Sequence, residues 1–347
     1  MDMRLPLKFT ETVPLQDAFQ RSLQELRVSV IDRCNFRCTY CMPADSLQGR
    51  GVFLPLEKLL TDHEIEDLVR AFVSLGVRKL RLTGGEPLLR PGLPALVEQL
   101  AGISGLEDIA LTTNGVMLPR LADDLAAAGL NRITVSLDTL DPKVLAEMSG
   151  GKAKLDEILG GISAAEAAGF RQLKINTVVQ KGVNDHTILD LLDHFRGTPH
   201  RVRLIEFMDV GNSNHWSESD VVPNSEWIEE IGNKWPILRV NSGNPAETAR
   251  RYEYVDGQGE IGFISSITQP FCGGCTRARV TADGIFYTCL FSNKGTNLMP
   301  LIRHSEDTGE LSRKVSEIWV RRNDRYSEER GQPGHDREKV EMYKLGG

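Results

Sequence analysis

The six cysteines of this sequence fall into two groups of three. The first group is spaced C-x3-C-x2-C and comprises Cys34, Cys38 and Cys41, and the second is spaced C-x2-C-x13-C and comprises Cys272, Cys275 and Cys289. Thiolates are ligands for soft metal centres, which include zinc, copper(I) and iron–sulfur clusters. Two triplets do not make three pairs, so the pattern argues against a set of disulfides.

The first triplet lacks the fourth ligand that a structural zinc site requires. The next histidine after Cys41 is His63, which lies well beyond this stretch. A [4Fe–4S] cluster held by three cysteines leaves one iron open to bind a substrate or cofactor. The spacing therefore predicts such a cluster, and a zinc site that takes a distant fourth ligand is the alternative interpretation.

The second triplet also offers three thiols and an open position. By itself the Cys272–Cys275 pair fits zinc, a redox dithiol or a cluster, and zinc with an added histidine such as His304 is the alternative. Arg277 and Arg279 lie between these cysteines and project to one face of a predicted strand. Two guanidiniums beside an open iron can bind a phosphorylated ligand through paired hydrogen bonds.

Further polar side chains are expected along the mouth of the same fold. They are Arg27, Arg81, Lys174 and the hydroxyl-bearing Thr112. Together with Arg277 and Arg279, five cations would converge on one face of a chain whose formal net charge is -7. This arrangement predicts a polyanionic small ligand such as a nucleoside triphosphate. The net charge argues against nucleic acid as a partner, because Lys and Arg are not in excess.

Short runs rich in β-branched residues alternate with amphipathic, helix-like segments through residues 26–208. The predicted strands are residues 26–32, 77–84, 108–114, 132–138, 172–179 and 201–208. Six β/α units predict a parallel sheet, either doubly wound or rolled into an incomplete (β/α) barrel. In both arrangements the active site lies at the carboxyl ends of the strands. The first cysteine loop and the TGGEP, TTNG and SLD sequences follow successive strands, so we expect them to meet there.

The regular alternation stops near Met208, which defines the expected segments of the chain. They are an N-terminal extension at 1–25, a partial barrel at 26–208, a C-terminal region with the second triplet at 209–322, and a tail at 323–347. Residues 251–291 are expected to form short antiparallel strands, and 307–322 an amphipathic helix. The polar tail is expected to be mobile until its final residues, and residues 1–20 match no informative pattern.

The N-terminus contains no apolar stretch of signal-peptide length, and it carries Asp2 and Glu11, which transit peptides avoid. No window approaches ~18 uninterrupted apolar residues, so no membrane span is predicted. We therefore expect a cytoplasmic protein, in a compartment where thiols remain reduced.

The first triplet, with Tyr40 before its last cysteine, resembles the signature of radical S-adenosylmethionine (SAM) enzymes. The TGGEP sequence at Thr83–Pro87 is similar to a second motif of that superfamily. The resemblance implies that the open iron binds the methionine part of SAM, whose reductive cleavage yields a 5′-deoxyadenosyl radical. The SAM contacts that it implies are Tyr40, Gly85, Glu86, Ser136 and Met208.

Both triplets, the Arg277–Arg279 pair, the MDVG sequence that begins at Met208 and the terminal Gly346 and Gly347 together resemble the GTP 3′,8-cyclase family of molybdenum-cofactor biosynthesis. The resemblance implies an α/β fold: an incomplete (β/α)6 TIM-like barrel with a C-terminal auxiliary-cluster region. It also implies two [4Fe–4S] clusters with GTP between them, and transfer of the 3′ hydrogen of GTP before C3′ bonds to guanine C8. The implied GTP contacts are Arg27, Arg81, Thr112, Lys174, Arg277 and Arg279, and the Gly346–Gly347 tail would reach the active site.

The same resemblance implies a flavodoxin- or ferredoxin-like electron donor, a downstream cyclic pyranopterin monophosphate synthase and a homodimer as partners. Two alternatives stay open. A radical SAM enzyme with an auxiliary cluster could modify a peptide, and a non-enzymatic binding protein could use both triplets as zinc sites. The basic residues favour a nucleotide over a peptide.

Overall fold

The computed structural model describes residues 15–44, 53–331 apart from 242, 245 and 306, and 339–346. These residues form a 12-stranded sheet in the order β12-β11-β10-β1-β2-β3-β4-β5-β6-β9-β8-β7. The first six strands are β1 (Glu25–Ser29), β2 (Lys79–Thr83), β3 (Asp108–Thr113), β4 (Arg132–Ser136), β5 (Lys174–Val179) and β6 (Arg201–Glu206). The others are β7 (Ile237–Val240), β8 (Arg250–Tyr254), β9 (Glu260–Ile264), β10 (Arg277–Val280), β11 (Ile285–Tyr287) and β12 (Thr296–Asn297).

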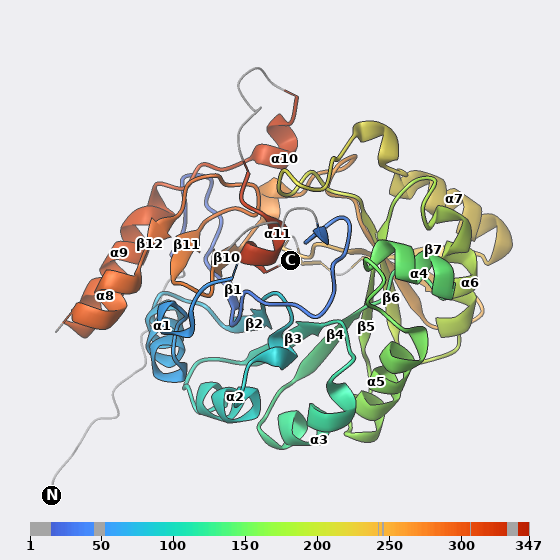
Figure 1. Ribbon diagram of the computed structural model, residues 1–347. Helices are drawn as coiled ribbons and strands as arrows, with labels where there is room; N and C mark the ends of the chain where they lie inside the picture. The colour runs from blue at the N-terminus through green and yellow to red at the C-terminus, as the bar shows by residue number, and fades with distance from the viewer. Residues whose placement is uncertain are drawn as a thin grey trace, which may run out of the picture.

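Strands β1 to β6 pair in chain order and are all parallel. β10 pairs in parallel with β1 and β9 in parallel with β6, so eight neighbouring strands run in the same direction. Figure 1 shows the sheet curved around a central space, and no ladder among the described residues joins β12 to β7. The predicted α/β fold with a parallel, open barrel is therefore confirmed.

The described residues also form α-helices, most of which cover the outer face of the curved sheet, whereas α11 (Met342–Leu345) lies over its central space (Figure 1). They are α1 (Asp62–Ser74), α2 (Leu93–Ala101), α3 (Leu118–Ala127), α4 (Pro142–Met148), α5 (Leu155–Ala167), α6 (Ile188–Phe195), α7 (Asn224–Lys234), α8 (Met299–His304), α9 (Thr308–Val320), α10 (Tyr326–Glu329) and α11 (Met342–Leu345). α1 begins at a capping box in which Thr61 and Glu64 each accept a hydrogen bond from the other's main-chain N–H. Within the described part of the chain, no helix has both the length and the apolar character needed to cross a bilayer.

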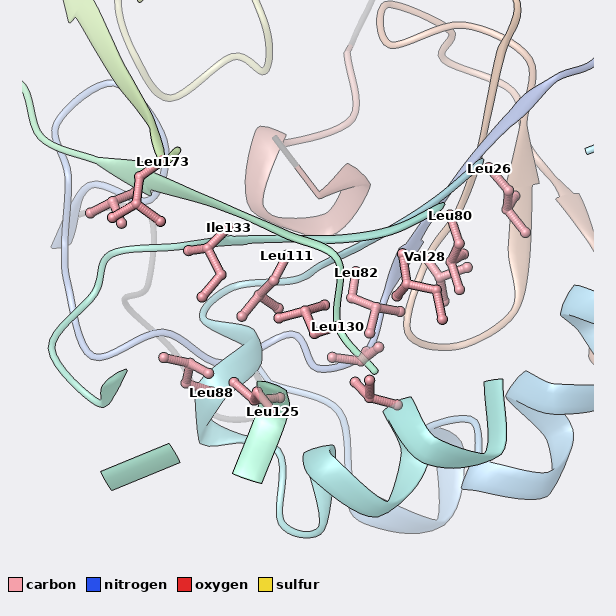
Figure 2. Close-up of a cluster of buried hydrophobic side chains, with 14 of the residues drawn as sticks. Leu26, Val28, Leu80, Leu82, Leu88, Leu111, Leu125, Leu130, Ile133 and Leu173 are labelled. Atoms are coloured by element: carbon pink, nitrogen blue, oxygen red, sulfur yellow. The ribbon is translucent and has the colours of Figure 1, made fainter. Parts of the chain in front are cut away.

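The parallel strands alternate apolar and polar side chains. Leu26 and Val28 of β1 and Leu80 and Leu82 of β2 are buried in one apolar cluster with helix residues such as Leu125 (Figure 2). The intervening side chains point to the other face, because successive residues on a strand alternate in direction. Parallel strands covered by apolar layers on both faces read as continuous apolar runs. The alternation here therefore indicates that the inner face of the barrel is polar.

The final described residues pack into the fold. Met342, Tyr343 and Leu345 of α11 are buried, and Figure 1 places α11 over the central space of the barrel. Residues 332–338 lie outside the described part of the chain. One sheet includes strands from both sides of Met208, and the division into segments at that residue remains a prediction.

Candidate active site inside the partial barrel

A cavity of about 630 Å³ lies inside the curved sheet. Its volume is in the range of small-molecule sites, which measure roughly 300–1,000 Å³. The six cysteines all line it, and none of them forms a disulfide. The residues expected to contact SAM or GTP line it as well: Arg27, Tyr40, Arg81, Gly85, Glu86, Thr112, Ser136, Lys174, Met208, Arg277 and Arg279. The structure thus brings these predicted site residues together around one space.

The loop that carries the first triplet follows β1. The Phe36 N–H donates to the Cys34 sulfur at 3.3 Å, and the Cys41 N–H donates to the Cys38 carbonyl at 3.0 Å. Arg37 reaches back to donate to the Cys34 carbonyl at 2.7 Å. Burial raises the pKa of all three thiols, to about 11 for Cys34. The buried thiols are therefore protonated until a metal centre displaces the protons.

The TGGEP loop after β2 packs directly on the first cysteine loop. The Gly85 N–H donates to the Ile31 carbonyl at 2.8 Å, and the Glu86 N–H donates to the Arg33 carbonyl at 2.7 Å. A Cβ atom on Gly85 would overlap the main chain of Arg33. Glycine is required here because two main chains approach each other closely.

Glu86 is a buried carboxylate at the ends of β2 and β3. It accepts hydrogen bonds from the Thr113 hydroxyl at 2.6 Å, the Asn114 N–H at 2.8 Å and the Leu88 N–H at 3.0 Å. Burial raises the pKa of Glu86 to about 7, although these hydrogen bonds act in the opposite direction. An ammonium group beside it would gain a charge-assisted hydrogen bond and stabilise the ionised form.

Tyr40 is held by a carboxylate that the sequence analysis did not single out. Its hydroxyl donates to Asp138 at 2.8 Å, and the Val178 N–H donates to the other carboxylate oxygen at 2.9 Å. Burial raises the pKa of Asp138 to about 6. Asp138 lies two residues after Ser136, the last residue of β4, so the contact ties the first cysteine loop to the end of that strand.

The second triplet lies at the opposite end of the barrel from the first. Cys275 precedes β10, whose first residue, Arg277, pairs with Glu25 at the start of β1. Cys34 instead follows the last residue of β1. Because β1 and β10 are parallel, the two triplets flank the cavity from its two ends. The cations expected along the mouth therefore line the interior between the triplets.

The second cysteine loop is short and charged. Cys272 begins a single turn of 3-10 helix, and Arg277 donates to the Cys275 sulfur at 3.5 Å. Burial alone would raise the pKa of Cys275, but Arg277 and Arg322 lower it to about 6, whereas burial raises that of Cys289 to about 12. Nowhere in the described residues do three His, Cys, Asp or Glu side chains surround a site for a single metal ion.

The wall between the triplets carries more cations than carboxylates, although Arg132, Arg201 and Arg251 form ion pairs with Asp108, Glu260 and Glu247, respectively. Twelve Arg or Lys side chains and five carboxylates line the cavity. The cations are Arg21, Arg27, Lys79, Arg81, Arg132, Lys174, Arg201, Arg203, Arg251, Arg277, Arg279 and Arg322. The chain as a whole carries a formal charge of -7, so positive charge is concentrated inside the barrel. Such an interior attracts a polyanion.

Glu25 organises several of these cations. Its carboxylate lies 3.1 Å from Arg27 Nε and 3.8 Å from Arg81 Nε. Burial by itself raises the pKa of Glu25, but Arg27, Arg81 and Arg277 hold it well below its usual range. Arg81 also donates to the Thr112 hydroxyl at 3.1 Å. One ionised carboxylate therefore faces several cations and leaves most of their charge unbalanced.

Lys174 and Arg203 extend this surface across β5 and β6. Arg203 donates through Nε and Nη2 to Asn176 Oδ1 at 2.9 and 2.6 Å. Burial, followed by the charge on Arg203, lowers the pKa of Lys174 to about 6. Arg279 Nε is buried without a hydrogen-bond partner among the described residues. A bound anion would stabilise the charged form of Lys174, whose pKa is lowered, and could accept a hydrogen bond from Arg279 Nε. Both features therefore favour an anion at this position.

The C-terminal tail reaches the first-triplet end of the cavity. Gly346 has a φ of 68°, and a Cβ atom on it would overlap the Thr83 hydroxyl at the end of β2. Met342 of α11 lines the cavity. Gly347 lies outside the described residues. The close approach to Thr83 and the positive φ both require glycine at position 346.

Asp209, the residue after Met208, anchors this tail. It accepts hydrogen bonds from the Tyr326 hydroxyl at 2.6 Å, from Arg330 Nη2 at 2.9 Å and from Lys339 Nζ at 2.9 Å. Burial raises the pKa of Asp209, but Tyr326, Arg330 and Lys339 hold it below its usual value. The tail is therefore fixed to the end of β6 before it crosses the cavity.

Two family models cover most of the chain: Radical SAM superfamily matches residues 28–195, and Molybdenum Cofactor Synthesis C matches residues 200–328. A GTP 3′,8-cyclase of Xanthomonas campestris pv. campestris (strain 8004) is 50% identical over 96% of this chain and 98% of its own length. A GTP 3′,8-cyclase of Acidothermus cellulolyticus is 48% identical over 91% of this chain and 89% of its own length. One of Staphylococcus saprophyticus subsp. saprophyticus is 43% identical over 96% of this chain and 99% of its own length. The chain belongs to the GTP 3′,8-cyclase family.

This member of the GTP 3′,8-cyclase family shares its fold with Streptococcus suis SuiB. The crystal structure of SuiB bound to S-adenosylmethionine aligns with a TM-score of 0.60 at 14% identity, covering 94% of this chain and 78% of SuiB. A second crystal structure of SuiB aligns with a TM-score of 0.58 at 15% identity, covering 87% of this chain and 67% of SuiB. At this identity the likeness concerns the fold.

Membership of the radical SAM superfamily implies a [4Fe–4S] cluster and SAM, and the residues at the first triplet fit both. Three free thiols converge on the cavity, and an iron centre with one open position suits that donor set. Beside them, Glu86 offers a buried carboxylate for an ammonium group, and Gly85 leaves the main chain accessible. In this GTP 3′,8-cyclase family member, both groups would therefore bind at the first-triplet end.

Several residues that line the cavity of this GTP 3′,8-cyclase family member were assigned no role in the sequence analysis. Glu25 and Arg203 lie on the inner faces of β1 and β6 and could have been found by extending the period of two along those strands. Asp138 follows the β4 strand directly, a position typical of active-site residues in such folds. Arg21 and Arg322 had no such signal, because both lie outside the β/α repeat.

Proposed function

We propose that this protein cyclises GTP to (8S)-3′,8-cyclo-7,8-dihydroguanosine 5′-triphosphate by radical SAM chemistry, the first step of molybdenum-cofactor biosynthesis. Identity to proteins named GTP 3′,8-cyclase over nearly the whole chain supports this reaction. The observation that carries it is one cavity with a cysteine triplet at each end and a positively charged wall between them. A nucleoside triphosphate supplies the missing negative charge.

At one end, Cys34, Cys38 and Cys41 hold a [4Fe–4S] cluster. When bound, this cluster and SAM supply the radical chemistry that removes a hydrogen atom from the substrate. The SAM contacts are assigned to Tyr40, Gly85, Glu86, Ser136 and Met208, all of which line that end of the cavity. Glu86 receives the ammonium group, since it is a buried carboxylate whose loop packs directly on the cysteine loop.

At the other end, Cys272, Cys275 and Cys289 would hold a second [4Fe–4S] cluster, which would bind the purine through its open position. Three thiols, and the basic Arg277 beside them, support this assignment. The triphosphate and ribose occupy the space between the ends. Their contacts are assigned to Arg27, Arg81, Thr112, Lys174, Arg277 and Arg279.

The contribution of these side chains is orientation. By binding the two ends of GTP, they place C3′ toward the first triplet and close to guanine C8. No side-chain general base is required by this scheme. The tail residues over the cavity exclude water from the reacting centre.

GTP deuterated at C3′ tests the assigned abstraction site. We expect anaerobically reconstituted enzyme with SAM and a reductant to transfer deuterium to 5′-deoxyadenosine and to form the cyclised triphosphate. GTP deuterated at C2′ is the control and should transfer none. Transfer from C2′ would overturn the assigned geometry.

A peptide substrate is the second candidate. Incubation of the reduced enzyme with SAM and either GTP or peptides separates the two, and the concentrated positive charge inside the barrel favours GTP. Metal analysis separates both from a zinc-binding protein, because two four-iron clusters give about eight irons per chain.

The electrons are proposed to come from a flavodoxin- or ferredoxin-like donor, and the product to pass to a cyclic pyranopterin monophosphate synthase. We also propose that two copies of this chain assemble as a homodimer.

A further inference from the structure

Asp17, Arg21 and Arg322 form a buried charged cluster beside the second triplet. Their side chains are 0%, 2% and 1% exposed, respectively. Asp17 Oδ2 accepts hydrogen bonds from Arg21 Nε at 2.6 Å and from Arg322 Nη1 at 3.3 Å. Asp17 Oδ1 accepts from the N–H groups of Phe19 and Arg21, each at 2.9 Å. The carboxylate therefore fixes both guanidiniums.

Both guanidiniums donate to main-chain carbonyls of the second cysteine loop. Arg21 Nη1 donates to the Cys272 carbonyl at 3.0 Å, and Arg322 Nη1 donates to the Cys275 carbonyl at 2.9 Å. Arg21 Nη1 also donates to the Asp324 carbonyl at 2.8 Å. Charged donors make these hydrogen bonds stronger than neutral ones, and burial strengthens them further. They connect the N-terminal segment, the loop and the segment after α9.

The second cysteine loop has little stiffness of its own. Gly273 and Gly274 separate Cys272 from Cys275, and glycine has the greatest main-chain freedom of any residue. The Cys275 N–H donates to the Cys272 carbonyl at 3.1 Å in a single 3-10 turn. Metal ligands must hold fixed relative positions, so the two arginines supply a restraint that the loop sequence lacks.

The arginines are themselves fixed by the buried ring of Trp319 on α9. The Arg322 guanidinium lies 4.5 Å from the centroid of that ring, and Trp319 Nε1 donates to the Arg21 carbonyl at 3.2 Å. Both arginines line the cavity. Arg21 Nη2 is buried without a hydrogen-bond partner among the described residues, so a donor remains beside the cysteine loop.

We infer that Asp17, Arg21 and Arg322 are positioning residues for the second cluster. They hold the carbonyls of Cys272 and Cys275 so that the thiols keep the geometry that retains iron. This inference rests on the proposed second cluster. Residues 15–23, which match no motif, are on this account part of the auxiliary site.

The test uses the full chain with Cys34, Cys38 and Cys41 replaced by alanine, so that only the second triplet binds iron. Reconstitution of this parent should give about four irons per chain. In Arg21→Met and Arg322→Met derivatives, iron release to a chelator should be roughly 10- to 100-fold faster, the range seen when outer contacts of metal ligands are removed. Arg321→Met is the matched control, because Arg321 is the exposed neighbour of Arg322, and its release rate should equal that of the parent.

Unfolding temperatures of the iron-free chains show whether each methionine variant keeps its fold. If a methionine variant does not fold, the corresponding lysine variant, Arg21→Lys or Arg322→Lys, is used in its place. Lysine keeps the buried positive charge but lacks the forked donors of arginine. Faster release from the lysine variant supports the inference. If folded variants release iron at the same rate as the control, the inference is overturned, but the proposal of a second cluster stands. A parent that binds no iron overturns the second cluster, and this inference with it.

Discussion

Lys174, a proposed contact of the triphosphate, should make binding of GTP depend on pH. Burial and the neighbouring cations Arg203, Arg132 and Arg81 lower its pKa to about 6, so the ligand-free side chain is about 1% protonated at pH 8. A bound triphosphate favours the charged lysine and raises this pKa again. GTP binding should therefore take up about one proton per site near pH 8.

The size of this effect on GTP affinity follows from the difference between the pH and the pKa of Lys174 in the ligand-free protein. Protonating the side chain at pH 8 costs about 2.7 kcal/mol, because each unit is worth about 1.4 kcal/mol. The lowered pKa means that the free state loses its proton first as the pH rises. Affinity for GTP should thus fall about tenfold for each pH unit above about 7, until the pKa of the bound state is reached.

Anaerobic titration calorimetry at pH 8, in two buffers with different ionisation enthalpies, measures the protons taken up. The wild-type protein should take up about one, and Lys174→Arg close to none, because arginine stays protonated. Equal proton uptake in the two proteins, or none in the wild type, would refute the assignment of this proton to Lys174.

Three substitutions test other parts of the site. Gly85→Ala places a Cβ on the main chain of Arg33 and should lower the free energy of unfolding by ~1–3 kcal/mol. The unfolding temperature of the iron-free chain measures this loss, and an unchanged temperature would contradict the close approach. Asp209→Asn leaves two partly buried cations, Arg330 and Lys339, with a weaker partner, so amide hydrogen exchange in residues 339–346 should become at least tenfold faster. Unchanged exchange would reject the anchor. Gly346→Ala forces the tail away from Thr83 and should lower product formation at least tenfold with no loss of iron; full activity would show that the tail contact is dispensable.

The fold was predictable because its signal is local. Six strands and the helices between them repeat along residues 26–208, and each buries an apolar face that the sequence displays. The positions of β9 and β10 were not predictable in the same way. They join β6 and β1 in parallel across long stretches of chain, and no short-range pattern encodes such a pairing.

The candidate site also contains residues that local sequence patterns could predict and residues that they could not. The cysteine triplets and the TGGEP loop stood out because their residue types and spacing carry chemistry. Asp17, Arg21 and Arg322 are ordinary charged residues whose relevance depends on packing between chain segments far apart. Only the folded structure shows that the two arginines donate hydrogen bonds to two carbonyls of a glycine-containing loop.

The apolar–polar alternation of the parallel strands has a further consequence. Cohesion of the barrel comes from its outer layer, while like charges repel one another across the interior. A nucleotide that neutralises this repulsion binds the folded chain and not the unfolded one. Folding and substrate occupancy are therefore thermodynamically linked, and the free GTP concentration sets how often the chain unfolds.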